Sequence, residues 1–250
     1  MSTPPPVPPG KRIAALFLLP NCNMGCAYCA AAARFDVASP HQVEGLLSGL
    51  AAGGIHSVVF GGGEPLLWPH DLERVGRRAR DLGLEVQVGS NGLAPPTGFA
   101  RFDWVDRYLL PLDAADPHEH DRLRSGPDSH HAIVLARLDE LLDAGKEVTI
   151  GTVVTRRNAA ALPALADFLA ARRAAGLRLH AWHLYRFLPV GRGGTGREAD
   201  LGLPAAAFRT AVERARARPL GFPAYRRDDM LRSSTVAFYW FEDGRLRTGA

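Results

Sequence analysis

Strand-like and helix-like segments alternate along most of this 250-residue chain. Alternation at this spacing is typical of parallel strands joined by right-handed crossover connections. Six strand–helix units are fewer than a closed eight-fold barrel needs. We therefore expect an α/β fold, a partial (βα)6 TIM-type barrel with parallel strands, and keep an open doubly wound sheet as the alternative. The expected strands cover residues 13–19, 57–60, 85–88, 105–112, 147–155 and 179–187, and the expected helices 40–52, 71–82, 131–144, 162–174 and 204–217.

The two ends of the chain differ from this alternating middle. Five prolines in the first ten residues favour an extended, mobile tail. Near the C-terminus, residues 236–241 and 245–247 flank the turn Glu242-Asp243-Gly244 and predict a β-hairpin. An edge hairpin that only packs against the sheet and a lid over the barrel would leave the same pattern. We expect three parts: a disordered Pro-rich tail (1–10), the partial barrel (11–218) and a C-terminal extension that covers the barrel mouth (219–250).

Composition and charge exclude several classes of protein. Charged residues make up 22% of the chain and its formal charge is +4, which are ordinary values with a slight basic excess. No apolar stretch approaches the ~20 residues that a membrane span needs, and the N-terminus lacks the cationic start and apolar core of a secretion signal. No basic patch interleaved with aromatic residues indicates nucleic-acid binding. We therefore expect a cytoplasmic protein with no membrane and no nucleic-acid partner.

The three cysteines of the chain, Cys22, Cys26 and Cys29, lie within eight residues. Their C-x3-C-x2-C spacing, directly after the first expected strand, would let three thiolates hold three corners of an iron–sulfur cube. A zinc site normally has four N or S ligands, and a ferredoxin-type cluster needs a fourth cysteine, which the chain lacks. An odd number of cysteines without an export signal also argues against disulfide bonds. The pattern favours a [4Fe–4S] cluster whose fourth iron has no protein ligand.

Further polar or glycine-rich motifs follow the next three strands. Residues 61–65 (GGGEP) follow the second strand, Ser90-Asn91-Gly92 follows the third, and Asp113 ends the fourth. Glycine lets the backbone approach a ligand closely, and exposed backbone groups can bind the charged head of an amino acid. Parallel α/β folds carry their chemistry at the carboxyl ends of the strands. Together with the cysteines, these motifs therefore predict an active site at that end of the sheet.

In combination, these residues resemble the radical S-adenosylmethionine superfamily, over about residues 12–190. The resemblance implies that Cys22, Cys26 and Cys29 ligate one [4Fe–4S] cluster and that S-adenosylmethionine chelates its fourth iron. It also implies which residues contact S-adenosylmethionine: Gly62, Gly63 and Glu64 at the methionine ammonium, Tyr28 and Val153 at the adenine, and Ser90, Asn91 and Asp113 at the ribose or methionine.

The resemblance further implies an enzyme that receives one electron from a low-potential donor such as flavodoxin or ferredoxin. Reductive cleavage of S-adenosylmethionine would give a 5′-deoxyadenosyl radical, which abstracts hydrogen from the substrate. The protein would position the reactants and exclude water. Dehydration, rearrangement, epimerisation and cyclisation are all open as outcomes.

The second half of the chain is most similar to the viperin-like and molybdenum-cofactor cyclase branch of the superfamily. Residues 152–158 (TVVTRRN) and 182–189 (WHLYRFLP) carry this likeness. That branch has a lysine where this chain has His183, which argues against dehydration of a nucleotide triphosphate. We expect a small polar substrate in specialised metabolism, with a nucleoside, nucleotide or sugar favoured. Five side chains could orient it, Arg156, Asn158, His183, Arg186 and Asp228, and Arg192 in the glycine-rich segment 191–196 is a further arginine of this kind.

Two other functions stay open from the sequence. A peptide-modifying or protein-activating member of the same superfamily would recruit its substrate through the open barrel face. The chain has no cysteines for an auxiliary cluster, which counts against that alternative. A non-catalytic zinc or iron–sulfur module would form no deoxyadenosine under reducing, anaerobic conditions.

Overall fold

The computed structural model describes residues 7–32, 34–124, 126 and 129–249. Residues 1–6 of the expected tail lie outside the described residues. One nine-stranded sheet forms the centre of the fold, with the strand order β7-β6-β5-β4-β3-β2-β1-β8-β9. Its strands are β1 (Ile13–Phe17), β2 (Ser57–Gly61), β3 (Glu85–Gly89), β4 (Arg107–Pro111), β5 (Glu147–Val154), β6 (Leu179–Arg186), β7 (Ala224–Arg227), β8 (Val236–Glu242) and β9 (Arg245–Gly249).

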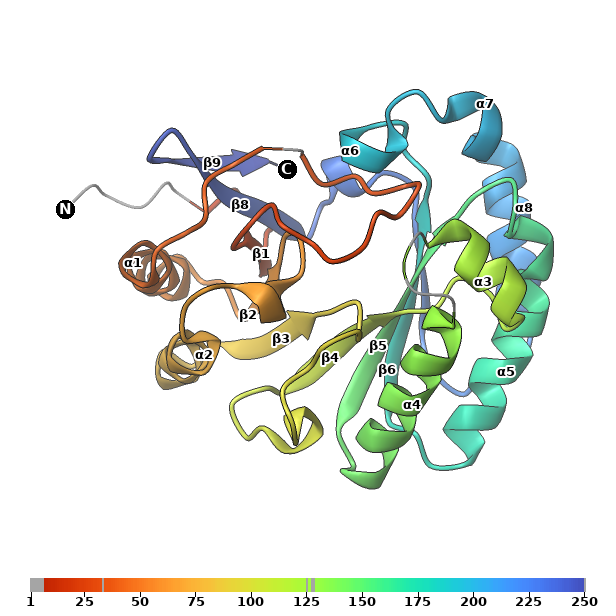
Figure 1. Ribbon diagram of the computed structural model, residues 1–250, viewed down its shortest axis with the longest axis horizontal. Coiled ribbons are helices and arrows are strands. Elements are labelled where there is room, and N and C mark those ends of the chain that lie inside the picture. Colours follow the sequence, from red (N-terminus) through yellow and green to blue (C-terminus); the bar gives the residue numbers. More distant parts are fainter. Residues whose placement is uncertain (1–6, 33, 125, 127–128, 250) are drawn as a thin grey trace.

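Helices cover the outside of this curved sheet. Figure 1 shows α1 and α2 on one flank and α4, α5 and α8 on the other. Within the described residues, the helices are α1 (Pro40–Ala52), α2 (Leu72–Asp81), α3 (Pro117–Leu123), α4 (His130–Asp143), α5 (Leu162–Ala174), α6 (Gly191–Gly194), α7 (Glu198–Leu201) and α8 (Ala205–Arg216).

The predicted α/β fold with a partial barrel is confirmed. Strands β1 to β6 are consecutive parallel neighbours, as crossover connections through helices require. The sequence did not predict α3, α6, α7 or β7, because these short elements are polar or glycine-rich and lack the apolar pattern that marks the others.

Local sequence signals explain where α1 begins. Ser39 and Gln42 form a capping box, in which the Ser39 hydroxyl accepts from the Gln42 amide (3.3 Å) and the Gln42 side chain accepts from the Ser39 amide (2.8 Å). Pro40 occupies the first turn, where its missing N–H costs nothing. The helix buries Val43 and Leu47 among other apolar side chains against the sheet.

The two faces of the sheet differ in character. Alternate residues point to opposite faces of a strand, and those facing the helices are apolar and buried in the main core, such as Leu16, Phe60 and Trp182. The inner face of the barrel is mixed, with glycine and polar residues next to apolar ones such as Val59 and Leu109. These inner residues include Ser57, Gly61, Gln87, Gly89, Arg107, Thr149, Gly151, His183 and Tyr185.

The C-terminal hairpin belongs to the sheet. Strand β8 pairs in parallel with β1, from Ile13 opposite Val236 to Leu16 opposite Tyr239. Strand β9 pairs with β8 in the antiparallel direction and forms the outer edge. Coverage of the barrel mouth by residues 219–250 stays a prediction.

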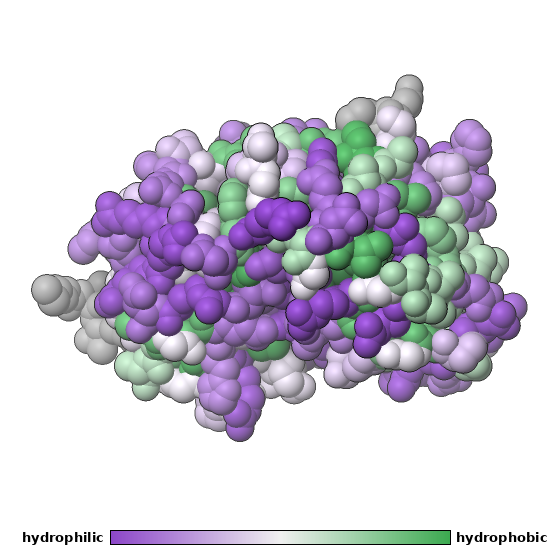
Figure 2. Space-filling model, turned by 90° about the horizontal axis from the view of Figure 1, so that it is seen from below, coloured by the Kyte–Doolittle hydropathy of each residue, from purple (hydrophilic) through white to green (hydrophobic). Residues whose placement is uncertain are grey.

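The surface is largely hydrophilic in the view from below, above all in the left half, on the side of α1 and α2 (Figure 2). Among the described residues, none of the helices combines the length and the apolar character that a bilayer crossing requires.

Candidate active site

The cysteine loop follows β1 and lies directly against the glycine loop that follows β2. The amides of Gly63 and Glu64 donate to the carbonyl oxygens of Leu19 (2.7 Å) and Asn21 (2.9 Å). A side chain at residue 63 would overlap the Asn21 carbonyl, so this close approach requires glycine. Gly62 has a φ of 120°, which other residues rarely adopt. The cysteine loop can therefore pack in this position only because residues 62 and 63 of the G-G-E sequence are glycines.

Glu64 links this glycine loop to the loop after β3. Glu64 is 2% exposed, and its carboxylate accepts from the amides of Asn91 (2.7 Å) and Leu66 (3.2 Å). Burial raises the pKa of Glu64, and the hydrogen bonds from Asn91, Ser90 and Leu66 counteract part of that rise. Glu64 thus fixes the position of the predicted Ser90-Asn91 segment.

Asn91 in turn reaches the cysteine loop. Its side-chain amide donates to Asn23 Oδ1 (2.7 Å) and to Cys22 Sγ (3.6 Å). The Ser90 hydroxyl accepts from the Gly92 amide (3.0 Å) and holds the turn between them. Of the predicted cofactor residues, Glu64, Ser90 and Asn91 are therefore brought together with Cys22.

Asp113, at the end of β4, is completely buried beneath the cysteine loop. Its Oδ2 accepts from Arg124 Nε (2.7 Å) and from the Tyr28 hydroxyl, and its Oδ1 accepts from the Val153 amide (3.0 Å). One carboxylate therefore joins three predicted site residues, Tyr28, Asp113 and Val153. Contact of Asp113 with the ribose or methionine stays a prediction.

Arg124 was not predicted, because it lies in an irregular segment after α3 and carries no motif. Its side chain is 8% exposed, lies over the Tyr28 ring at 5.4 Å, and has Nη1 3.9 Å from Cys26 Sγ. Burial lowers the pKa of Arg124, but the negative charge of Asp113 and the neighbouring Tyr28 and Cys26 outweigh it and raise the pKa above its usual value. Burial raises the pKa of the Cys26 thiol, and Arg124 opposes that rise.

Asn158 has a different role from the predicted substrate contact. It is completely buried, and its Oδ1 accepts from the amide and hydroxyl of Thr155 (2.8 and 3.0 Å). Its Nδ2 donates to the carbonyl oxygens of Asp113 (2.9 Å) and Val153 (3.0 Å). Because Oδ1 and Nδ2 are both occupied by bonds within the protein, Asn158 connects the end of β4 to β5 and holds Asp113 and Val153 in place.

Two buried histidines connect Asp113 to Asn91. The Asp113 amide donates to His120 Nδ1 (3.1 Å), so His120 carries its proton on Nε2 and donates to His130 Nδ1 (2.8 Å). His130 then donates from Nε2 to the Asn91 carbonyl (2.8 Å). Burial, with Arg124 and the other histidines, lowers the pKa of His120 to about 2. His120, Asp121 and His130 are close enough to hold a metal ion, but the ring nitrogens of both histidines are committed to this chain of hydrogen bonds.

His183 lies on the inner face of the barrel among two tyrosines and an arginine. Its Nδ1 lies 3.3 Å from the Tyr185 hydroxyl and 3.4 Å from Arg227 Nε. Tyr225 packs edge-on against His183 at 5.4 Å, and the Arg227 guanidinium lies over the Tyr225 ring at 5.1 Å. Burial, together with Arg227, lowers the pKa of His183 to about 3, so the ring is neutral. Tyr225 and Arg227 were not predicted as site residues, since strand β7 itself was not, and Tyr185 on β6 carries no motif that marks it.

The remaining predicted substrate residues make other contacts. Arg186 Nε donates to the Asp228 carbonyl (3.0 Å), so these two predicted residues do meet. The Asp228 carboxylate pairs with Arg226 (2.8 Å). Arg156 Nε donates to the Gly202 carbonyl (3.1 Å), between α7 and α8. A substrate role for Arg156, Arg186 and Asp228 stays a prediction.

The donor set of the cysteine loop fits an iron–sulfur cluster with S-adenosylmethionine. Ligands of one zinc ion lie about 2.3 Å from it, which puts sulfur pairs about 4 Å apart. Among the described residues, the three cysteines do not form a set whose ligand atoms all lie within 4.8 Å of one another. In the same part of the chain, the carbonyl oxygens of Gly62 and Gly63 accept no backbone hydrogen bond, which leaves them available to an ammonium group.

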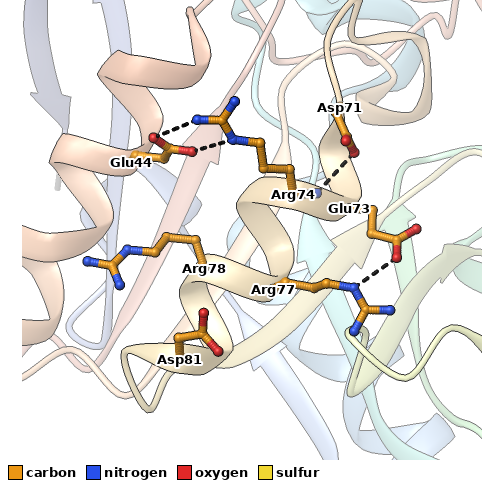
Figure 3. A pocket seen from close by; sticks show the side chains of 7 residues that line it. All are labelled: Glu44, Asp71, Glu73, Arg74, Arg77, Arg78 and Asp81. Atoms are coloured by element: carbon orange, nitrogen blue, oxygen red, sulfur yellow. Dashed lines mark hydrogen bonds and ion pairs between the residues drawn. The ribbon is translucent and has the colours of Figure 1, made fainter.

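A surface hollow of about 490 Å³ lies elsewhere, between α1 and α2. Figure 3 shows that its lining is charged, with Arg74 paired to Glu44 (2.9 Å) and Arg77 to Glu73 (2.8 Å). None of the predicted site residues lines it. Arg74 and Arg77 are thus paired with acidic side chains of the same lining, and the hollow lies apart from the site at the strand ends.

Comparisons with known proteins agree with this geometry. The chain is 29% identical over 201 residues to the AdoMet-dependent heme synthase of Oleidesulfovibrio alaskensis, covering 78% of this chain and 49% of that protein. It is 31% identical over 163 residues to GTP 3′,8-cyclase 1 of Pseudomonas aeruginosa, covering 61% of this chain and 49% of that protein. The crystal structure of Streptococcus suis SuiB bound to S-adenosylmethionine matches with a TM-score of 0.74 and 16% identity, over 94% of this chain and 59% of that chain.

The chain spans about half the length of these two curated relatives, and the likeness to SuiB concerns the fold alone. The family model described as the Radical SAM superfamily matches residues 16–169. Because this match covers more than half of the 250 residues and contains the cysteine and glycine loops, the chain belongs to the radical S-adenosylmethionine superfamily.

Proposed function

We propose that this enzyme reductively cleaves S-adenosylmethionine and abstracts hydrogen from a small polar substrate bound against the inner face of the barrel. The observation that carries the proposal is the contrast between the two faces of the sheet. The outer face is an apolar core, whereas the inner face carries glycine and polar side chains among a few apolar ones such as Val59 and Leu109. We favour a nucleoside, nucleotide or sugar as the substrate.

The cofactors of the superfamily are a [4Fe–4S] cluster and S-adenosylmethionine. When bound, they supply a 5′-deoxyadenosyl radical at the cost of one electron, which we assign to a low-potential flavodoxin or ferredoxin in the cytoplasm. Cys22, Cys26 and Cys29 would hold the cluster. The carbonyl oxygens of Gly62 and Gly63 would accept from the methionine ammonium.

The protein would exclude water from one side of this site with a small apolar cluster. Tyr28, Leu123, Phe187 and Leu201 are buried together, and Val153 packs against them. Val153 is also the lateral neighbour of Tyr185 on β6. The inner-face group around His183 therefore lies one strand away from the apolar wall of the cysteine loop.

Glycines on the inner face leave room for the substrate. A side chain at Gly61 would meet no atom within 4 Å, and one at Gly151 would approach only Leu109 (3.5 Å) and Tyr185 (3.7 Å). Arg227, Tyr225 and the neutral His183 offer a cation, an aromatic ring and a ring nitrogen at the edge of this space. This chemistry suits a polar ring-bearing molecule, and the relative from Pseudomonas aeruginosa is named for a reaction of GTP.

The class of chemistry is tested by deoxyadenosine formation. Anaerobically reconstituted protein with a strong reductant should release 5′-deoxyadenosine from S-adenosylmethionine. Cys26→Ala should abolish the release, because the cluster then loses a ligand. The exposed Ser48→Ala, in α1, is the control and should retain it. Undiminished turnover by Cys26→Ala would show that the cysteines do not carry the reaction.

The substrate class is tested by stimulation of that release. Nucleosides, nucleotides and sugar phosphates are compared with short peptides, each at the same concentration. Stimulation by a member of the first group, with deuterium transferred from labelled substrate into 5′-deoxyadenosine, supports the proposal. Stimulation by peptides alone would favour the alternative, a peptide-modifying or protein-activating enzyme.

A further inference from the structure

The short helix α6 packs on the cysteine loop, although Arg192 and Cys29 are 163 residues apart in the sequence. The amides of Arg192 and Gly193 donate to the carbonyl oxygens of Ala31 and Cys29, both at 3.0 Å. A side chain at residue 193 would overlap the Cys26 carbonyl, and one at residue 191, where φ is 75°, would overlap the backbone of Ala30. The G-R-G-G sequence of α6 is therefore shaped for backbone contact with the third cysteine.

The side chain of Arg192 completes this contact. Its Nε donates to Cys29 Sγ at 3.3 Å, and its Nη1 donates to the Pro20 carbonyl at the start of the loop. The two comparable N–H···S contacts are longer, 3.6 Å at Cys22 and 3.9 Å at Cys26. The nearby Arg197 differs, because it pairs with Asp200 (3.5 Å). The donors of Arg192 are thus directed at the sulfur and at the backbone that presents it.

We propose that Arg192 positions Cys29 and raises the reduction potential of the cluster through this hydrogen bond. The inference rests on the proposed ligation of the cluster by Cys29. Reduction adds negative charge to an iron–sulfur cluster, and hydrogen bonds to its sulfurs are among the factors that set its potential. A cationic N–H donor at a ligand sulfur stabilises the more negative, reduced state, and the guanidinium keeps its charge at every accessible pH.

The test is a potentiometric titration of the reconstituted, full-length protein followed by EPR. Arg192→Gln removes the charge and should shift the midpoint potential to a more negative value. Arg192→Lys keeps the charge but moves the donor away from the Nε position, and its midpoint should lie between those of Arg192→Gln and the parent. Arg197→Gln is the matched control and should keep the midpoint of the parent. Arg192 is exposed, so its replacement leaves the core intact.

A second readout uses reductants of different strength. With dithionite, the fraction of reduced cluster in Arg192→Gln should be smaller than in the parent, and titanium(III) citrate should restore it. An unchanged midpoint in Arg192→Gln, or an equal shift in Arg197→Gln, overturns the inference.

Two further outcomes would also overturn the proposed effect of Arg192 on the reduction potential. Loss of the cluster from both Arg192 variants, with an unchanged circular dichroism spectrum, would mean that the residue serves cluster retention and would overturn the effect on potential. A parent protein that assembles no [4Fe–4S] cluster would overturn the proposed function together with this inference. An unshifted potential in a protein that does hold the cluster overturns the inference alone.

Discussion

Asp113 and Arg124 form a buried ion pair, with Oδ2 and Nε 2.7 Å apart and side-chain exposures of 0% and 8%. The same carboxylate holds Tyr28 and the Val153 amide, so this pair supports the cysteine loop and β5 at once. Removing one partner of a buried pair leaves the other charge without compensation.

Asp113→Asn should therefore destabilise the protein by about 3–5 kcal/mol, because the charge of Arg124 stays buried. Urea unfolding monitored by circular dichroism measures the loss. The control is Asp167→Asn, which breaks an exposed pair with Arg218 (2.6 Å) and should change stability little, since solvent screens such pairs. Equal effects of the two substitutions would contradict the structural role of Asp113.

The buried histidines should make stability depend on pH. The folded-state pKa of His120 is about 2, held low by burial, so the unfolded chain binds more protons below the ordinary value of 6.5. Stability from this group is fully present above pH 6.5 and is lost as the pH falls below it, by up to about 1.4 kcal/mol per pH unit. Urea unfolding at several pH values should show this slope.

His120→Gln removes this titrating group and should make that slope shallower. The matched variant is His41→Gln, on the exposed face of α1, which should leave the slope of the parent. An identical slope in His120→Gln would mean that His120 is not held neutral in the folded protein.

Gly63→Ala should impair iron binding. The new methyl group would overlap the Asn21 carbonyl and push the cysteine loop away from the glycine loop, with an overpacking cost of about 1–3 kcal/mol. Iron and sulfide content after reconstitution measures the effect. Gly45→Ala in α1 meets no atom within 4 Å and should retain full iron content, with a gain in stability of about 1 kcal/mol. A full complement of iron in Gly63→Ala would refute the close packing of the two loops.

Gly151→Val should separate substrate binding from cofactor cleavage. Its side chain fills the inner face beside Leu109 and Tyr185, and a β-branched residue suits a strand. Substrate-dependent release of deoxyadenosine should fall by roughly ten- to a hundredfold, because a displaced reactant loses its productive geometry. Release without substrate should persist. Gly151→Ala is the control with the smaller loss, and a parallel decline of both activities would place Gly151 at the cofactor rather than at the substrate.

The fold could be predicted from the sequence where local patterns decide it. Hydrophobic periods mark β1 to β6, and the capping box at Ser39 marks the start of α1. The pairing of β8 with β1 could not be predicted, because nothing in residues 236–239 specifies which edge they join. Strand β7 has four residues and is likewise placed by tertiary contact alone.

The residues of the candidate site could likewise be predicted only where a local motif marks them. Motifs on single loops pointed to the cysteines, Glu64 and Asn91, because each lies in a short pattern directly after a strand. Arg124 and Arg192 reach the cysteines from 98 and 163 residues away, so their partners are a property of the folded chain. Asn158 was predicted to contact the substrate because it is a polar residue that follows a strand. In the structure it is completely buried, which the sequence alone does not indicate.

The parallel pairing of β8 with β1 has a consequence for biosynthesis. Ile13–Leu16, the strand that leads into the cysteines, takes one of its two strand partners from residues 236–239. During translation this strand waits with one edge bare until those residues leave the ribosome. Substitutions that weaken the pairing of β8 with β1 would therefore disturb iron insertion from a distant part of the sequence.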